Sequence, residues 1–176
     1  MREKVIKISK IIFVPIICLA TFSFINFWLI PLIFCFIIVV FNLKILKLNT
    51  IIIFLVASYI SFLVSILLYS VIGYMLELLL GSEFFVGKWR IVDISYLIIL
   101  GIISPILFFY FNSFILKSLS FKNNLFKIFL SKLIISLGLF LSYTYGLDIE
   151  YSFMLWQFVV SLVLQLIIYQ NFKKVD

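Results

Sequence analysis

Long runs of apolar residues, separated by short polar and charged segments, dominate the pattern along this chain. A helix needs about 20 apolar residues to cross the roughly 30 Å hydrocarbon core of a bilayer. Six runs reach or approach that length, and they cover residues 5–24, 27–43, 50–80, 94–116, 125–145 and 151–171. The pattern therefore predicts an all-α integral membrane protein, a bundle of six transmembrane helices in a single transmembrane domain over residues 1–176.

The basic residues indicate how this bundle is oriented. With six spans, one side of the membrane receives the basic N-terminal segment, the basic loops after the second and fourth runs, and the basic C-terminal segment. The other side receives Glu83, Lys88, Arg90, Asp93, Asp148 and Glu150. Because lysine and arginine concentrate in cytoplasmic loops, both termini are expected in the cytoplasm, with the chain in the plasma (inner) membrane. A five-span alternative with one long first helix would place basic loops on both sides.

Composition excludes the soluble and disordered classes. Of the 176 residues, 66% are hydrophobic and 12% are charged, and the mean hydropathy is +1.34. A soluble domain is about 45–50% apolar and about 25% charged, and disorder requires low hydrophobicity. The net charge of +7 lies in short segments beside the spans, where anionic headgroups account for it. We therefore expect the lipid bilayer as a partner and no nucleic acid.

Several kinds of reaction chemistry are absent from the sequence. The chain has no histidine, which excludes a serine–histidine pair and a histidine metal site. Cys18 and Cys35 lie within the first two runs, where cysteine behaves as a small apolar residue. Glycine motifs that bind nucleotides are missing. We therefore expect no enzyme activity, no cofactor and no metal.

The third run carries polar and small residues at a spacing of four. They are Ser61, Ser65, Tyr69, Gly73 and Glu77. This spacing puts them along one slowly drifting face of a helix. The run is also longer than a bilayer requires, so the helix must tilt or project beyond the outer interface. The face is interpreted either as a packing seam between helices or as the wall of a polar-lined cavity with Glu77 at its outer mouth.

The fourth and sixth runs contain further polar features. Gln157, Ser161 and Gln165 recur every four residues in the sixth run. Two glutamines facing lipid are costly, so this face is expected to look into the bundle, either as structural glue or as a stripe that contacts a solute or partner. The dipeptide Ser104–Pro105 in the fourth run is a candidate hinge, because proline frees a backbone carbonyl.

The longest segment outside the runs is residues 81–93. It combines Glu83, Trp89, Arg90 and Asp93 with several apolar residues. Tryptophan and arginine dominate binding hot spots. The segment is interpreted either as an interfacial anchor with local ion pairs or as a lid over an outward-facing pocket.

In the number and orientation of its spans, the chain resembles two groups of small membrane proteins. One comprises the substrate-binding S components of energy-coupling-factor vitamin transporters, and the other the MreD-type rod-shape proteins. The alanine-x-x-x-alanine element of the first group is absent, since Ala20 stands alone, and so is the glycine–aspartate signature of the second. No residue role is carried over from either group.

Two functional hypotheses follow from these features. The first is a solute-binding or transport subunit that works with partner membrane proteins or as a homo-oligomer. Its candidate binding residues are Glu77, Glu83, Trp89, Arg90, Asp93, Gln157 and Gln165. The alternative is a non-transporting membrane partner, either an assembly subunit of an envelope complex or an immunity protein against a pore-forming toxin. A buried, solvent-reachable charge would distinguish the two, and the sequence offers none that is secure.

Overall fold

The protein is almost entirely helical in its described part. A computed structural model describes residues 2–22, 29–43, 48–81, 85–86, 89–113, 121–146 and 149–171. The helices are α1 (Arg2–Phe22), α2 (Ile30–Asn42), α3 (Leu48–Leu80), α4 (Ile91–Ile98), α5 (Ser104–Ser113), α6 (Phe121–Thr144) and α7 (Ile149–Asn171). A π-helical segment, Ile99–Ile103, joins α4 to α5, so that one helical path runs from residue 91 to residue 113.

Four helical stretches are long and apolar enough to cross a membrane. They are Asn49–Leu80, Asp93–Ser113, Asn123–Thr144 and Tyr151–Tyr169. Two shorter apolar stretches, Ile8–Thr21 and Ile30–Asn42, belong to α1 and α2. The expected second span, residues 27–43, thus contains a 13-residue helix, and the part of it before residue 29 lies outside the described residues. The described helices match the six apolar runs in order, and four of them have the length of a full span.

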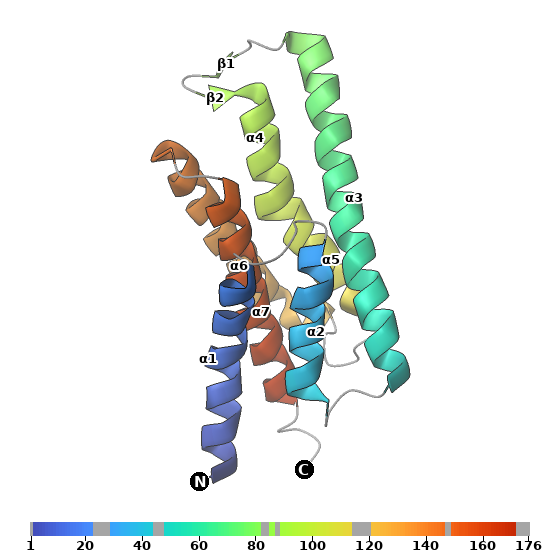
Figure 1. Cartoon of the computed structure of the whole chain (residues 1–176). Helices are drawn as coiled ribbons and strands as arrows, with labels where there is room; N and C mark the ends of the chain where they lie inside the picture. Colours follow the sequence, from blue (N-terminus) through green and yellow to red (C-terminus); the bar gives the residue numbers. More distant parts are fainter. Residues whose placement is uncertain are drawn as a thin grey trace.

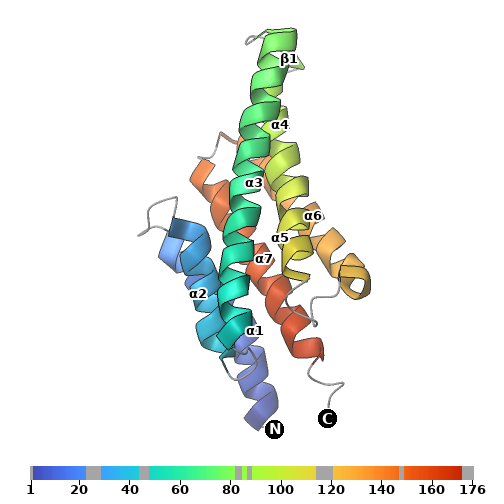
Figure 2. The ribbon, with the colours of Figure 1, turned by 90° about the vertical axis from the view of Figure 1, so that its right-hand side faces the viewer.

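The helices form a closed ring of neighbours in the order α1, α7, α6, α4–α5, α3 and α2, with α2 returning to α1. Figure 2 shows α3 running from the upper end of the molecule through most of its height, with α4 and α5 on one side of it and α2 on the other. Of the four long stretches, the one in α7 is the most buried and the one in α3 the least. Among these four stretches, α7 therefore contributes the most to the interior of the bundle.

The start of α1 and the end of α7 lie at the same end of the bundle (Figure 1). The end of α2, the start of α3 and the end of α5 point to that end as well. The 33 residues of α3 span about 50 Å at a rise of 1.5 Å per residue. As expected for so long a run, the last turns of α3 project at the opposite end (Figure 1).

A short β-hairpin follows α3, which the sequence did not predict. Strands β1 (Phe85–Val86) and β2 (Trp89–Arg90) pair antiparallel, with Phe85 opposite Arg90 and Val86 opposite Trp89. The hairpin leads directly into α4, at the end of the bundle away from the termini (Figure 1). Two-residue strands carry too little alternation to be recognised from sequence.

Apolar side chains fill the interior and also cover the outside. The core contains Phe54, Phe108, Phe109, Leu164 and Ile167, all almost fully buried. Many large apolar side chains are nevertheless more than half exposed, among them Leu67, Leu78, Leu79, Phe126 and Leu137. An outward apolar surface of this extent is compatible with a lipid environment.

Candidate functional site

A cavity inside the bundle could hold a ligand. It lies between α2, α3, the π-helical segment with α5, and α7, and it is partly open to the surface. Its described lining residues are Ile30, Pro31, Phe34, Cys35, Ser58, Ser61, Phe62, Ser65, Ile66, Leu100, Ser104, Phe108, Phe153, Trp156 and Gln157. Ligand pockets are typically of this kind, mainly apolar with a few polar groups.

One wall of the cavity carries three serines of α3. The Ser61 hydroxyl donates to the carbonyl oxygen of Ser58 at 2.8 Å, and the Ser65 hydroxyl donates to the carbonyl oxygen of Ser61 at 2.8 Å. Each hydroxyl has one proton and two acceptor lone pairs. Because the proton is used within the helix, Ser61 and Ser65 retain lone pairs that can accept a hydrogen bond. All three serines are buried.

The third serine of this wall joins α3 to α5. The Nδ2 atom of Asn112 donates to Ser58 Oγ at 3.1 Å and to the carbonyl oxygen of Phe108 at 2.8 Å. Asn112 is completely buried. The pair therefore holds the two helices together directly beside the cavity.

The π-helical segment and the start of α5 form another part of the cavity wall. Pro105 has no backbone N–H, so it cannot bond to the carbonyl of Gly101 four residues earlier. The backbone N–H of Ser104 bonds instead to the carbonyl of Ile99, five residues back. This wider turn is the local distortion that proline and π-bulges produce. Leu100 and Ser104, which both line the cavity, belong to this distorted part of the helix.

An aromatic cluster of Phe34, Phe108 and Trp156 lines the cavity between α2, α5 and α7. The ring centroids of Phe34 and Phe108 are 5.9 Å apart, and those of Phe108 and Trp156 are 5.7 Å apart. Both pairs involving Phe108 are edge-to-face, a favoured arrangement of aromatic rings. The buried Nε1–H group of Trp156 finds no acceptor among the described residues. Trp156 is thus a lining residue of the cavity that also holds a buried donor without a described partner.

The two glutamines of the sixth run both point into the bundle, as their spacing predicts. Gln157 is 4% exposed and lines the cavity. Gln165 is fully buried two turns further along α7, and its Oε1 accepts a hydrogen bond from Nδ2 of Asn42 at 3.4 Å. Gln165 is not among the residues that line the cavity. The two candidate residues thus occupy different surroundings on one helix face.

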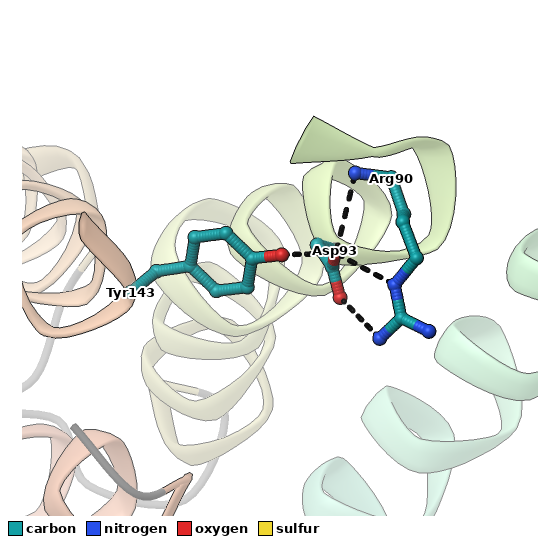
Figure 3. A network of polar contacts seen from close by, with 3 residues as sticks. All are labelled: Arg90, Asp93 and Tyr143. Carbon is teal, nitrogen blue, oxygen red and sulfur yellow. Dashed lines mark hydrogen bonds and ion pairs between the residues drawn. The ribbon is translucent and has the colours of Figure 1, made fainter. Parts of the chain in front are cut away.

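Arg90 and Asp93 meet at the far end of the bundle, away from the cavity. Figure 3 shows the Asp93 carboxylate between the Arg90 guanidinium and the Tyr143 hydroxyl of α6. Arg90 Nε lies 3.2 Å from Asp93 Oδ2, and Arg90 Nη2 lies 3.4 Å from Oδ1. The backbone N–H of Arg90 also donates to Oδ2, at 3.3 Å, which satisfies a free amide at the start of α4.

This network fastens the hairpin to the bundle. The hydrogen bonds to Asp93, and then its charge, raise the pKa of the Arg90 guanidinium above its ordinary value. Arg90 therefore stays cationic at any physiological pH. Its side chain is 59% exposed, whereas that of Asp93 is 13% exposed. The geometry is that of an anchor between β2, α4 and α6.

The remaining candidate residues lie at the same end or outside the described part. Glu77 is exposed on the last turns of α3, and the described residues provide no ion-pair partner for it. Trp89 belongs to β2 through its backbone, and its side chain lies outside the described part. Glu83 also lies outside the described residues. None of the described residues of the 81–93 segment lines the cavity.

Sequence reasoning did not identify several residues of the cavity. Ser58 lies one turn before Ser61 and continues the same helix face, so the spacing of polar residues could have predicted it. Phe34, Phe108 and Trp156 belong to three different helices, and their meeting depends on the packing of the bundle. Their apolar surroundings in the sequence gave no sign of a shared site.

Comparison of the chain with protein-family models, with curated protein sequences and with solved structures gave no match. The cavity, the buried polar groups and the charge pattern of this chain are therefore the features that bear on its function.

Proposed function

We propose that this chain crosses the plasma (inner) membrane six times, with both termini in the cytoplasm. The basic segments of the sequence adjoin the start of α1, the end of α2, the start of α3, the end of α5 and the end of α7. All of these helix ends lie at one end of the bundle, which supports the proposal (Figure 1). Basic residues concentrate on the cytoplasmic side. On this proposal α1 and α2 are the first two spans.

Cysteine accessibility tests the orientation. In a cysteine-free C18A/C35A background, S82C places a thiol in the segment after α3, and S118C places one in the segment after α5. A membrane-impermeant maleimide applied to intact cells is expected to label S82C and to label S118C only after lysis. Labelling of both variants in intact cells would contradict the six-span orientation.

The function that the geometry supports best is binding of a small solute inside the bundle, as a solute-binding or transport subunit. The single observation that carries it is the cavity between α2, α3, α5 and α7, with serine, cysteine and glutamine side chains in otherwise apolar walls. The interior of a membrane protein places polar groups where they meet each other, water or a ligand. The sequence has no nucleotide-binding glycine motif, so transport would require partner membrane proteins or a homo-oligomer.

The test is to identify what the protein retains. The protein is extracted at native expression into nanodiscs, and all retained small molecules and proteins are identified by mass spectrometry. A solute is expected in wild type, absent from S65L because the added side chain fills the cavity, and present in S70L. Ser65 is buried and lines the cavity, whereas Ser70 is exposed on the same helix, so S70L is a matched control.

Two outcomes would overturn the solute-binding proposal. One is a wild-type protein that is empty in every preparation. The other is a retained molecule whose amount is the same in wild type and S65L, with S65L shown to be folded by its thermal unfolding. A stoichiometric protein partner together with an empty cavity would favour the alternative, a non-transporting membrane partner.

A further inference from the structure

We infer that the cavity takes an uncharged aromatic amide, or a ring compound of the same chemistry with one polar edge that both donates and accepts hydrogen bonds. The inference rests on the proposed function and specifies the class of its ligand.

The walls exclude a charged ligand. None of the described residues that line the cavity carries a charge. An ion placed among apolar and hydroxyl groups within the bundle would lose its hydration without gaining a counter-charge. A neutral molecule meets no such penalty. The ligand is therefore uncharged in its bound form.

The ring content of the walls favours a flat apolar body. Aromatic side chains come from four elements around the cavity: Phe34, Phe62, Phe108, Phe153 and Trp156. Phe34, Phe108 and Trp156 already pack against one another at ring distances of 5.7 to 5.9 Å. A ligand ring can join such a cluster edge-to-face or offset-stacked, which stabilises it beyond the area it buries.

The α3 wall calls for a donor on the ligand. The hydroxyls of Ser61 and Ser65 donate their hydrogen bonds to backbone carbonyls within α3. Their remaining capacity is to accept. An N–H or O–H group on one edge of the ligand would satisfy these lone pairs.

The α7 side of the cavity favours an acceptor on the ligand. The Trp156 indole can only donate, and its buried Nε1–H has no acceptor among the described residues. A buried donor without a partner is unfavourable, so a ligand carbonyl that bonded to this N–H would remove the penalty. The neighbouring Gln157 amide can support either role. A carboxamide combines the required donor and acceptor in one neutral group.

A matched series of probes tests the inference. Naphthamide is neutral with a donor and an acceptor, naphthoate is anionic, naphthylmethylammonium is cationic, and methylnaphthalene has no polar edge. Each probe is measured by equilibrium dialysis against nanodiscs that contain wild type, S65L, S70L or W156F, with empty nanodiscs as the reference for lipid partition. In a W28F/W89F variant, Trp156 is the remaining tryptophan and its fluorescence gives a second readout.

Naphthamide is expected to bind wild type and S70L at least about tenfold more tightly than either charged probe, a difference of about 1.4 kcal/mol. It should quench Trp156 and lose its binding in S65L. W156F should weaken naphthamide several-fold and leave methylnaphthalene unchanged, because the substitution removes the donor and keeps a ring.

Two results would overturn the ligand class. If naphthoate or naphthylmethylammonium binds as tightly as naphthamide, the cavity accepts charge and the class is wrong, while the solute-binding proposal stands. If no probe binds wild type more than S65L, the inference also fails. The retained-molecule measurement then decides the proposed function independently.

Discussion

Ser58 on α3 and Asn112 on α5 are joined by a hydrogen bond of 3.1 Å from Asn112 Nδ2 to Ser58 Oγ. The same Nδ2 atom donates to the carbonyl oxygen of Phe108. In lipid, helices associate through such bonds and close packing, because the surrounding tails are as apolar as the core. The pair therefore connects α3, which carries the serines that line the cavity, to α5, which carries Phe108.

Replacing Asn112 by alanine should destabilise the bundle. The change leaves Ser58 without its partner and opens a void at a fully buried position, so we expect a loss of about 1–3 kcal/mol in the free energy of unfolding. Unfolding by dodecyl sulfate in mixed micelles, followed by circular dichroism, measures it. The control is S113A, because the Ser113 hydroxyl donates only to the carbonyl of Tyr110 in its own helix. Equal stability of N112A and wild type would show that the pair does not hold α3 to α5.

Asn42 and Gln165 offer a second test of buried polar contacts. Their amides meet at 3.4 Å, yet Asn42 Oδ1 and Gln165 Nε2 have no partners among the described residues. Either single change to leucine leaves the other amide without its cross-helix partner and should cost about 1 kcal/mol. The double change N42L/Q165L removes both polar groups and should be about as stable as wild type. A double-mutant cycle in the same unfolding assay measures the coupling, and strictly additive single effects would contradict it.

Gly101 permits a close approach between the π-helical segment and α6. A Cβ atom at this position would lie 2.7 Å from Ser136 Oγ and 3.1 Å from Ser136 Cα. G101A must therefore push the two helices apart, and we expect it to cost about 1–3 kcal/mol despite the higher helix propensity of alanine. The melting temperature of the purified protein in detergent gives the direction of the change.

Gly138 supplies the matched comparison. A Cβ atom there would meet the side chain of Leu155, which can rotate away. We expect G138A to be close to neutral, since the gain in helix propensity offsets the repacking. The double variant G101A/S136G should recover part of the loss, because it removes the Ser136 hydroxyl and keeps the backbone contact. A G101A protein as stable as G138A would contradict the proposed backbone constraint.

Much of the fold could be predicted because charge and hydropathy act locally along the chain. The six apolar runs correspond in order to the described helices, and the long third run is one continuous helix. The inward face of α7 followed from the spacing of Gln157 and Gln165, both of which are buried. These predictions required only the period of the helix and the cost of placing polar groups against lipid.

The rest of the fold depends on contacts that periodicity does not contain. Ser104–Pro105 indicated a bend in the fourth run, but the π-helical turn before it also reflects the close packing of Gly101 against α6. The hairpin of β1 and β2 is too short to leave a pattern. Both features arise from backbone groups that must find partners in three dimensions.

The candidate site likewise contains contacts that the sequence could predict and contacts that depend on how the helices pack. The sequence placed Arg90 and Asp93 near each other in the chain, and they bond. It offered no means to tell that Trp156 packs against Phe34 and Phe108, whose helices are separated by long stretches of chain. The order of the helices around the bundle decides which side chains share a cavity, and this order is a property of the assembled bundle.

The contact between Asp93 and Tyr143 yields a prediction about local dynamics. D93N removes the charge that Arg90 pairs with and weakens the acceptor for both the Tyr143 hydroxyl and the Arg90 backbone N–H. The start of α4 should then open more often, because local opening is governed by the few contacts that secure a segment. Amide hydrogen exchange should become several-fold faster over residues 90–94 and remain unchanged in the buried part of α7.

The variants Y143F and R90Q each remove one partner of Asp93, so each should accelerate exchange less than D93N does. If D93N exchanges like wild type over residues 90–94, the network does not anchor the hairpin to α6. If it accelerates exchange equally in α4 and α7, Asp93 stabilises the whole bundle.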